Sequence, residues 1–411
     1  MNKASILVVF IFLAITAVAQ TIPKLRIDPT QAYGGYASEY FNSIEYIPLE
    51  TTKESLLGDI AQMVITDSSI VVSDLDTKSV YFFSLTGKYL TKVKAKDEVI
   101  GSISVDGESK DILIVSYHPA TGVISTNNYS FTGTRSTRKK LLQDQLFGLT
   151  SIGGGYFAQF NSCYFAPDQK PQDSVIHLIN IYKGAELYKS LLPYNQSKEK
   201  AFCLFGGTLS GIQNNQPTDG SFYISTPYEH MMYKITKDTA LQVFQFVFPA
   251  NRVIAQKVMK SNDLRYLDSV RRSIQNGTEV IVEVKNVLFY KDLLLFKLSP
   301  NKYVFNAGST NETQYNFIYD TVSGKLVSLE HLTPDKNCFY LPLLGNGMMT
   351  MLHGLYFMDG AFYSAVSSLQ MFSADEKNKT NKPQYSAALK TYFKTQNRKS
   401  NPVIVKMKLK E

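Results

Sequence analysis

The chain has 411 residues, of which 44% are hydrophobic and 19% are charged, and its formal net charge is +8 at pH 7. This composition is typical of a folded globular protein, and it excludes a disordered chain and a bundle of membrane helices. The length favours either one large domain built from repeats or two smaller domains. The 26 Tyr and 25 Phe, together with many Val and Ile residues and no Trp, favour β-strands over helices.

The N-terminus has the pattern of an export signal. Lys3 precedes the apolar run SILVVFIFLAITAVA, which ends in the small-x-small cleavage site Ala-Val-Ala at residues 17–19. The apolar run is shorter than the roughly 20 residues that a spanning helix needs, so a retained membrane anchor is the less favoured alternative. No Cys follows it, and no lipid anchor is predicted. We expect residues 1–19 to be a cleaved signal peptide, residues 20–42 to be an N-terminal extension, and the mature chain to be periplasmic or extracellular, without a transmembrane segment.

One short β pattern recurs along the chain. In SSIVVSDLDTKSVYFFSLTGKYL (68–90) an apolar run, a polar gap, a second apolar run and a turn follow each other. Both apolar runs match those of GSFYISTPYEHMMYKITKDTAL (220–241) at a constant offset of 152 residues, which is about three periods of roughly fifty residues, a length typical of propeller blades. A third copy, in residues 293–329, carries Gly324 where the first carries Gly87.

Such a meander cannot bury both of its faces alone, so the copies must stack or close into a ring. We predict an all-β fold: a single six-bladed β-propeller of four-stranded antiparallel blades over residues 43–411. The segment IEYIPLE (44–50) has no hairpin of its own and is expected to pair with NPVIVKMKLK (401–410), which would close the ring. The period places the blades at approximately residues 56–94, 97–142, 146–195, 200–249, 278–333 and 339–410.

Two segments break the β pattern. Residues 250–275 carry apolar side chains at three- and four-residue spacings, and residues 383–396 open with Pro and have one apolar helical face. We expect short helical insertions in both. Such inserts often carry binding residues, and helices that only cover a blade edge are an equally favoured interpretation.

Four segments carry a resemblance to a known family. They are residues 47–74 (IPLETTKESLLGDIAQMVITDSSIVVSD), 79–90, 222–235 and 400–410 (SNPVIVKMKLK). Together they resemble the six-bladed β-propeller family of secreted and lipid-anchored Bacteroidetes proteins, which is itself similar to propellers of NHL repeats. The resemblance extends from about residue 43 to the C-terminus and implies the propeller fold. That family has no established activity and no agreed catalytic residues, so no functional site is carried over. Many relatives begin with a lipobox Cys, which is missing here.

The cysteines are odd in number for an oxidising compartment. One disulfide with one buried thiol is an alternative for which the sequence does not choose the pair, and three separate buried thiols are the favoured interpretation. No Cys or His cluster has the spacing of metal ligands. The cysteines are Cys163, Cys203 and Cys338.

No linear motif indicates catalysis. The histidines never fall in HxH or HExxH spacing, and Ser210 lacks the GxSxG context of a nucleophile. Asp74-Leu75-Asp76 resembles part of a calcium loop without its Gly and closing Glu, so we interpret it as a turn whose carboxylates accept backbone N–H groups. We therefore assign no catalytic, cofactor-binding or metal residue and predict no cofactor, and we keep a calcium ion in the channel as an open alternative. The histidines are His118, His177, His230, His331 and His353.

Positive residues gather locally at residues 135–140 and 377–410, which we interpret as solvated faces. Because the sequence has no nucleic-acid-binding motif, we do not expect nucleic acid as a partner. A weak attraction to acidic glycans or phosphate-bearing surfaces stays open as an alternative. Four tripeptides resemble the Asp-Ser/Thr-apolar acceptor pattern of Bacteroidetes O-glycosylation. They begin at Asp173, Asp238, Asp268 and Asp320.

Two functions from different classes follow. The favoured one is a monomeric, non-enzymatic binding module of the cell envelope, whose mouth is lined by Tyr, Asn and Asp from turns and holds a glycan, a peptide or a partner protein. The alternative is a propeller hydrolase or lyase with a site assembled in the central channel. Histidines or several carboxylates that meet at one end of the channel would favour the enzyme, and an aromatic and amide-lined mouth would favour binding.

Overall fold

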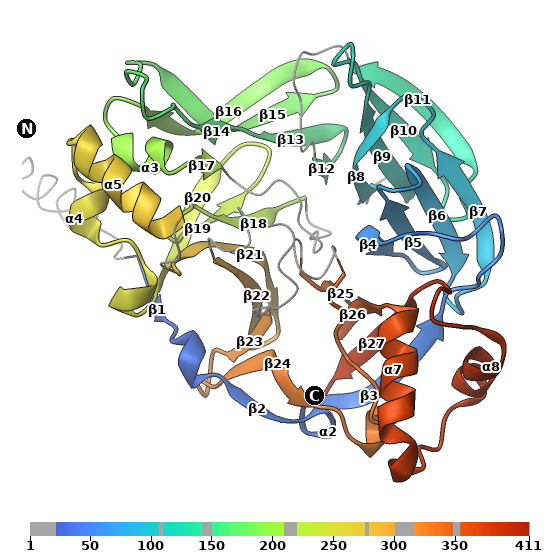
Figure 1. Ribbon diagram of the computed structural model, residues 1–411. Coiled ribbons are helices and arrows are strands. Elements are labelled where there is room, and N and C mark those ends of the chain that lie inside the picture. Colours follow the sequence, from blue (N-terminus) through green and yellow to red (C-terminus); the bar gives the residue numbers. More distant parts are fainter. Residues whose placement is uncertain are drawn as a thin grey trace, which may run out of the picture.

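Six small sheets surround a central channel in the computed structural model, so the predicted six-bladed β-propeller is confirmed (Figure 1). The structure describes residues 22–106, 110–141, 150–208, 220–275, 279–300, 316–347 and 354–410, and the expected signal peptide lies outside them. Blade 1 consists of β4 (Ile60–Ile65), β5 (Ser69–Asp74), β6 (Ser79–Ser84) and β7 (Tyr89–Lys94). Blade 2 consists of β8 (Val99–Asp106), β9 (Asp111–Tyr117), β10 (Ile124–Tyr129) and β11 (Arg135–Leu141). Blade 3 consists of β12 (Thr150–Gly153), β13 (Tyr156–Phe160), β15 (Val175–Lys183) and β16 (Glu186–Asn195).

The last three blades each take a strand from the N-terminal segment. Blade 4 consists of β18 (Phe222–Ser225), β19 (Met231–Ile235), β20 (Ala240–Val247) and the parallel strand β1 (Lys24–Arg26). Blade 5 has five strands: β21 (Ile281–Tyr290), β22 (Leu293–Pro300), β23 (Asn316–Asp320), β24 (Leu326–Thr333) and the parallel strand β2 (Tyr33–Tyr36). Blade 6 consists of β25 (Tyr356–Met358), β26 (Ala361–Val366), β27 (Val403–Leu409) and β3 (Phe41–Pro48).

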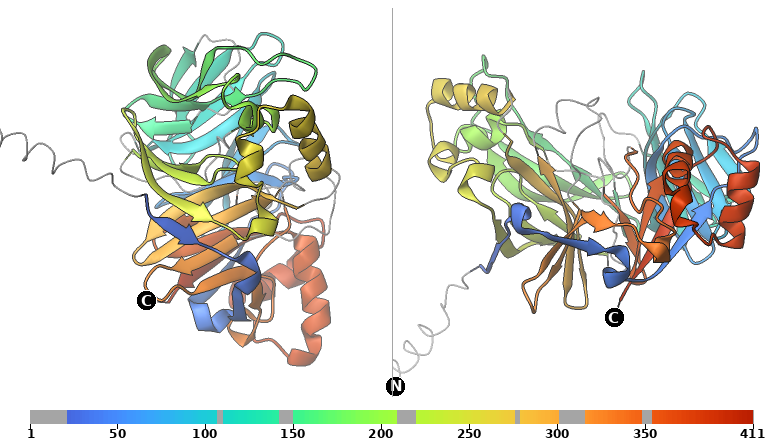
Figure 2. Two further views of the ribbon diagram at one scale, coloured as in Figure 1. Left: turned by 90° about the vertical axis from the view of Figure 1, so that its left-hand side faces the viewer. Right: turned by 60° about the horizontal axis from the view of Figure 1, so that its bottom comes forward.

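The N-terminal segment runs along the outer edges of blades 4, 5 and 6 (Figures 1 and 2). Its strand β3 pairs antiparallel with β27, with Ile47 opposite Ile404, so the predicted closure of the ring is confirmed. Parallel strands β1 and β2 depart from the expected purely antiparallel blades. They cover the outer edges of β20 and β24, whose backbone groups would otherwise lie open to pairing with other chains. The 3₁₀ helix η1 (Pro29–Gln31) and the helix α2 (Ala37–Tyr40) connect these strands.

Six hydrophobic clusters in the described residues hold the ring together, one between each pair of neighbouring blades. Every residue of β4 and β5 is buried, because blade 1 packs against a neighbouring blade with each of its two faces. This explains why the sequence shows nearly continuous apolar runs rather than strict alternation. Gly87 and Gly324 occupy equivalent turns of blades 1 and 5 with φ of +83° and +72°. A side chain at Gly87 would come within 2.2 Å of the Pro48 carbonyl oxygen.

Helices lie in the connections between strands. Both predicted insertions are confirmed: η2 (Ala250–Arg252), α4 (Gln256–Met259) and α5 (Leu264–Gln275) form the first, and α8 (Ala387–Thr395) forms the second. The helix α7 (Ser368–Asn378) was not predicted, although Ser367 and Gln370 form a capping box at its start. The remaining helices are α3 (Lys200–Leu204), η3 (Lys336–Cys338) and η5 (Lys379–Asn381). No helix in the described ranges is both long and apolar enough to cross a membrane.

A disulfide joins Cys163 and Cys203, while Cys338 is a buried free thiol. The expectation of three separate thiols is therefore wrong. Cys163 belongs to the short strand β14 (Ser162–Cys163), which pairs with β17 (Gly207–Thr208) directly after α3. This pairing joins a connection within blade 3 to the connection between blades 3 and 4, and spacing along the chain carries no sign of it.

Candidate functional site

A cavity of about 1110 Å³ lies in the central channel, slightly larger than the roughly 300–1,000 Å³ typical of small-molecule sites. All six blades line it, mostly with the carboxyl ends of their inner strands. Successive strands run antiparallel, so the connections alternate between the two ends of a blade. The turn after β25 lines the cavity. The helices α7 and α8 follow the next strand, β26, and therefore lie at the opposite end of blade 6. The lining segments are residues 62–67, 102–105, 150–154, 220–222, 288–290 and 356–359, with Lys110, Phe131, Tyr156 and residues 236–238.

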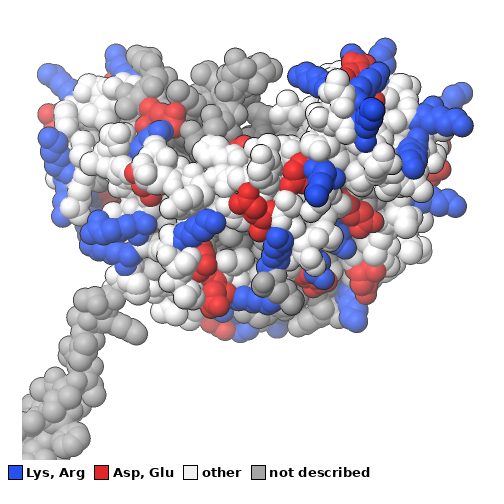
Figure 3. Space-filling view, turned by 90° about the horizontal axis from the view of Figure 1, so that it is seen from below, with Lys and Arg blue, Asp and Glu red and all other residues white. Residues whose placement is uncertain are grey.

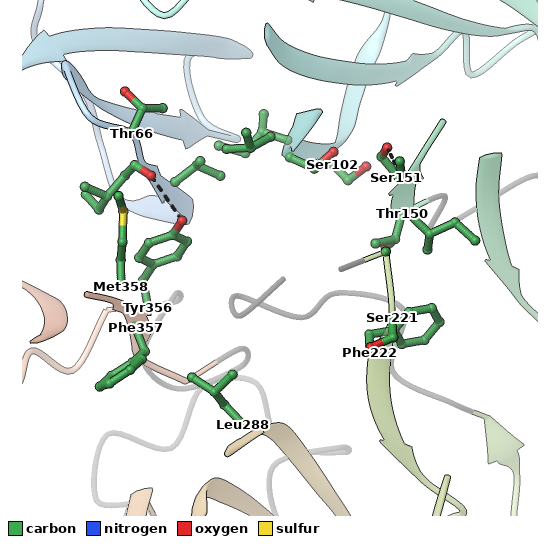
Figure 4. Close-up of a pocket in the computed structure, with 18 of the residues that line it drawn as sticks. Thr66, Ser102, Thr150, Ser151, Ser221, Phe222, Leu288, Tyr356, Phe357 and Met358 are labelled. Atoms are coloured by element: carbon green, nitrogen blue, oxygen red, sulfur yellow. Dashed lines mark hydrogen bonds between the residues drawn. The ribbon is translucent and has the colours of Figure 1, made fainter. Parts of the chain in front are cut away.

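Seven serine and threonine residues belong to the lining, and Figure 4 labels five of them. The Ser151 hydroxyl accepts a hydrogen bond from the Gly153 N–H at 3.3 Å. The Tyr356 hydroxyl donates to the Ile65 carbonyl at 3.1 Å, and burial raises the pKa of Tyr356 to about 12, so this phenol stays neutral at physiological pH. The serine and threonine residues of the lining are Thr66, Ser102, Ser104, Thr150, Ser151, Ser221 and Thr236.

Aromatic and apolar side chains complete the wall. Phe222 packs edge-on against Phe160 with ring centres 5.7 Å apart, and Phe357 packs against Phe362 with ring centres 5.0 Å apart. Met358 and Leu288 lie on the same side of the cavity as Phe357 in Figure 4. Because the rings pack against buried neighbours, the apolar surfaces are held in place before any ligand enters.

Charged residues lie in the turns at the end of the cavity, which we call the mouth: Asp67, Lys110, Lys237, Asp238 and Asp359. The three carboxylates come from blades 1, 4 and 6, and Asp238 forms an ion pair with Lys237 at 2.6 Å. Within the described part of the chain, no three His, Cys, Asp or Glu side chains are placed to hold a metal ion. The described lining therefore has a neutral wall and a charged mouth.

Two lysines contact an aromatic pair at the mouth, between blades 3 and 4. Tyr156 and Tyr188 meet edge to face with ring centres 5.1 Å apart. Lys183 Nζ lies 5.3 Å from the centre of the Tyr156 ring, and Lys237 Nζ lies 5.5 Å from it. Asp238 accepts a hydrogen bond from the Tyr188 hydroxyl at 2.8 Å, and the hydrogen bonds from Lys237 and Tyr188 lower the pKa of Asp238. We call Tyr156, Tyr188, Lys183, Lys237 and Asp238 the lysine cluster.

The histidines do not meet. His230 is buried between blades 4 and 5, where its Nε2 lies 2.9 Å from the Ile281 carbonyl oxygen. Burial lowers the pKa of His230 to about 4, so the ring is neutral at physiological pH. His118 and His177 belong to blades 2 and 3, and His331 is exposed in blade 5. His353 and Ser210 lie outside the described residues, and none of the described histidines lines the cavity.

The Asp74–Asp76 segment is a turn, as interpreted from the sequence. The Asp74 carboxylate is buried and accepts hydrogen bonds from the N–H groups of Gly58 and Asp76, both at 2.9 Å. The Thr77 hydroxyl donates a third at 2.8 Å. The carboxylate oxygens therefore stabilise the turn between β5 and β6 and bind the backbone at Gly58.

The positive runs are exposed where the structure describes them, as at Lys377, Lys379 and Lys390. Figure 3 shows basic and acidic side chains interspersed over the face seen from below. Of the tripeptides that resemble glycosylation acceptors, those with Thr239 and Thr321 lie in exposed turns, Ser174 is exposed just before β15, and Ser269 lies on α5. Glycosylation of these residues stays a prediction.

The sequence prediction of the mouth was correct only in part. Tyr and Asp do line the cavity, whereas the expected Asn residues are absent from the described lining, in which Gln62 supplies an amide. The serine and threonine wall was missed. Its signal is a small hydroxyl residue near the carboxyl end of an inner strand, as at Thr66 in blade 1 and Ser104 in blade 2. This signal is visible only once the blades are aligned.

A solved structure with a TM-score above 0.5 supports the fold. A Bacteroides fragilis protein, described as a candidate exported protein, superposes with a TM-score of 0.60 at 12% sequence identity and covers 94% of this chain and 100% of its own. A Bacteroides thetaiotaomicron protein of unknown function has a TM-score of 0.39 at 10% identity and covers 92% of this chain and 75% of its own. A streptogramin B lyase has a TM-score of 0.38 at 12% identity and covers 91% and 99%, respectively.

A comparison with curated proteins gives no match. Among family models, the one for a domain of unknown function called DUF4934 matches residues 26–408, which include strands of all six blades. The chain therefore belongs to the DUF4934 family.

Proposed function

We propose that this protein is an exported, non-enzymatic binding module whose channel cavity holds an oligosaccharide. The observation that carries the proposal is the cavity itself, to which every blade contributes and whose wall combines neutral hydroxyl groups with fixed aromatic rings. Serine and threonine hydroxyls both donate and accept hydrogen bonds, as sugar hydroxyls do. Aromatic side chains of the lining that are less buried, such as Phe289 and Tyr156, offer apolar faces to the C–H groups of a sugar ring.

The neutral wall also argues against a ligand that is charged throughout its length. A charged group buried without a partner loses its hydration at a large cost in free energy. The Tyr356 phenol, whose pKa burial raises to about 12, adds no charge to the wall. A polyhydroxylated ligand makes hydrogen bonds of similar strength to the wall and to water, so its binding does not incur this cost.

Export is supported by three observations. The first 19 residues have the pattern of a signal peptide, and the Cys163–Cys203 disulfide is typical of oxidising compartments. The similar Bacteroides fragilis structure is described as a candidate exported protein. We therefore place the mature chain in the periplasm or outside the cell.

The alternative is a hydrolase or lyase, which would need titratable groups that converge on a substrate. The described lining offers Asp67, Asp238 and Asp359 from three different blades, and Asp238 is already paired with Lys237. No observation on the described residues favours turnover over binding.

Calorimetric titration of the chain from residue 20 with neutral and acidic oligosaccharides and short peptides tests the proposal. The chain has no Trp, so Met358→Trp places a single tryptophan in the cavity, and Leu369→Trp, on the exposed surface of α7, is the matched control. We expect an oligosaccharide to change the fluorescence of Met358→Trp only, to bind more weakly to it than to the wild type, and to be recovered intact. Release of shortened sugars would favour the hydrolase or lyase, and failure of every oligosaccharide to bind would contradict the proposal.

A further inference from the structure

The lysine cluster determines which oligosaccharide fits. We propose that the ligand is an acidic oligosaccharide, whose carboxylate or sulfate group binds Lys183 and Lys237 at the mouth while neutral parts of the chain lie in the channel. This inference rests on the proposed function and names its ligand class.

The two ammonium groups converge on one aromatic pair. Lys183 Nζ and Lys237 Nζ lie 5.3 and 5.5 Å from the centre of the Tyr156 ring, and Lys237 Nζ also lies 5.6 Å from the centre of the Tyr188 ring. An aromatic face attracts an ammonium group without contributing a negative charge. The lysines are therefore held in position while N–H donors stay available to an anion.

The cluster carries an excess positive charge. Lys237 is paired with Asp238, whose second oxygen accepts from Tyr188. Lys183 is exposed and forms no ion pair with a described residue, although Glu186 lies opposite it in the hairpin. Lys237 therefore has a carboxylate partner within the lysine cluster, whereas the ammonium group of Lys183 lies outside the ion pairs of the described residues and can bind an anion.

The cluster is continuous with the cavity, because Tyr156, Lys237 and Asp238 belong to its lining. Charge also differs around the mouth. Asp67 in blade 1 and Asp359 in blade 6 are exposed and repel an anion from that side. An acidic group at one end of the ligand is thus directed towards blades 3 and 4, and its neutral sugars extend along the hydroxyl wall.

The experiment compares three tetramers on the chain from residue 20: a galactose tetramer that ends in a single galacturonate, the same tetramer with a single terminal sulfate, and the uncharged galactose tetramer. Because hydrogen bonds to a charged group are stronger than those between neutral groups, we expect at least one acidic tetramer to bind about tenfold more tightly than the neutral one at low salt. The advantage should shrink as salt is added, since the cluster is exposed.

Matched variants separate the cluster from the cavity. Lys183→Met removes the charge and keeps the apolar stem, so it should abolish most of the advantage of the acidic tetramer and leave the affinity for the neutral tetramer unchanged. Lys170→Met, at an exposed lysine outside the lining, is the control. Asp238→Asn frees Lys237 and should increase the affinity for the acidic tetramer.

Tyr156 acts as a positioning residue. Tyr156→Phe keeps the ring under the lysines and should preserve the advantage of the acidic tetramer, whereas Tyr156→Leu should lose it. Melting temperatures of all variants, measured without ligand, separate a loss of binding from a loss of folding.

Each outcome decides between the two proposals. Equal affinity of the wild type for neutral and acidic tetramers would overturn the inference and leave the proposed function intact. An acidic advantage that survives Lys183→Met and is unchanged by Asp238→Asn would also overturn it. No binding of any tetramer, with binding of an acidic peptide instead, would contradict both the proposed function and the inference.

Discussion

The side-chain amide of Asn401 donates a hydrogen bond to the backbone carbonyl of Glu50 at 2.8 Å, across 351 residues of sequence. Asn401 is fully buried, and its amide also donates to the Ser55 carbonyl at 2.8 Å. Its oxygen accepts from the Leu57 N–H at 3.1 Å. One side chain therefore joins the start of β27 to the connection between β3 and β4, beside the point where the ring closes.

We predict that Asn401→Ala lowers the free energy of unfolding by about 2–4 kcal/mol, because the Leu57 N–H and the Ser55 carbonyl lose a buried partner, while the Glu50 carbonyl keeps only the Ser55 hydroxyl. Asn401→Asp should lower it at least as much, since a carboxylate cannot donate to the two carbonyls. Urea unfolding measures both, with Asn381→Ala on the exposed surface as the control. An Asn401→Ala protein as stable as the control would show that the closure does not depend on this side chain.

The Cys163–Cys203 disulfide should stabilise the junction of blades 3 and 4. It links residues separated by 40 positions, for which the loss of chain entropy in the unfolded state is worth about 4 kcal/mol. We expect Cys163→Ser with Cys203→Ser to lower the melting temperature, and a reductant to lower that of the wild type but not that of the double variant. The same response to reductant in both proteins would contradict a role for this bond, since the remaining Cys338 is a free thiol.

His230 should make the stability depend on pH. Burial lowers the pKa of His230 to about 4, whereas the unfolded chain has the ordinary value of 6.5. Between these values the unfolded state binds a proton that the folded state does not. The free energy of unfolding is therefore unaffected by His230 above pH 6.5, and it falls by up to about 3 kcal/mol as the pH drops from 6.5 to 4.

Urea unfolding of the wild type and of His230→Gln between pH 7.5 and pH 4 measures this effect. The neighbouring Glu229 acts in the opposite direction, because burial raises the pKa of its carboxyl group and the stability that it contributes is lost as the pH rises. Glu229 is present in both proteins, so the difference between the two curves isolates His230. Parallel curves would show that His230 does not titrate between the two states.

Two buried serines should respond to the loss of their hydroxyl groups in opposite directions. The Ser104 hydroxyl, in the cavity wall, has no hydrogen-bond partner among the described residues, so Ser104→Ala should raise the free energy of unfolding by up to about 1 kcal/mol. The Ser225 hydroxyl donates to the Val284 carbonyl and accepts from the Val284 N–H, so Ser225→Ala should lower it by about 2 kcal/mol. Thermal and urea unfolding test the pair, and a destabilised Ser104→Ala protein would contradict the first expectation.

Much of the fold could be predicted because its signals are local and periodic. The two apolar runs at residues 70–83 recur at 222–235 as the hairpins β5–β6 and β18–β19, which each need neighbours on both faces. The unpaired segment around Ile47 predicted the closing strand for the same reason. In contrast, β1 is a three-residue strand, Lys24–Arg26, with too little apolar pattern to be recognised, and it forms because it covers the outer edge of β20.

The sequence by itself determined the number of blades, their order and the closure of the ring, because the repeat length, the turn residues and the burial of both faces are properties of neighbouring residues. Only the tertiary structure decided that Cys163 pairs with Cys203, and that Thr66, Ser102, Ser151 and Ser221 share one wall. It also decided that Lys183 and Lys237, 54 residues apart, both contact the Tyr156 ring. These contacts join different connections and blades, and their proximity depends on how the blades pack around the channel, which no local spacing encodes.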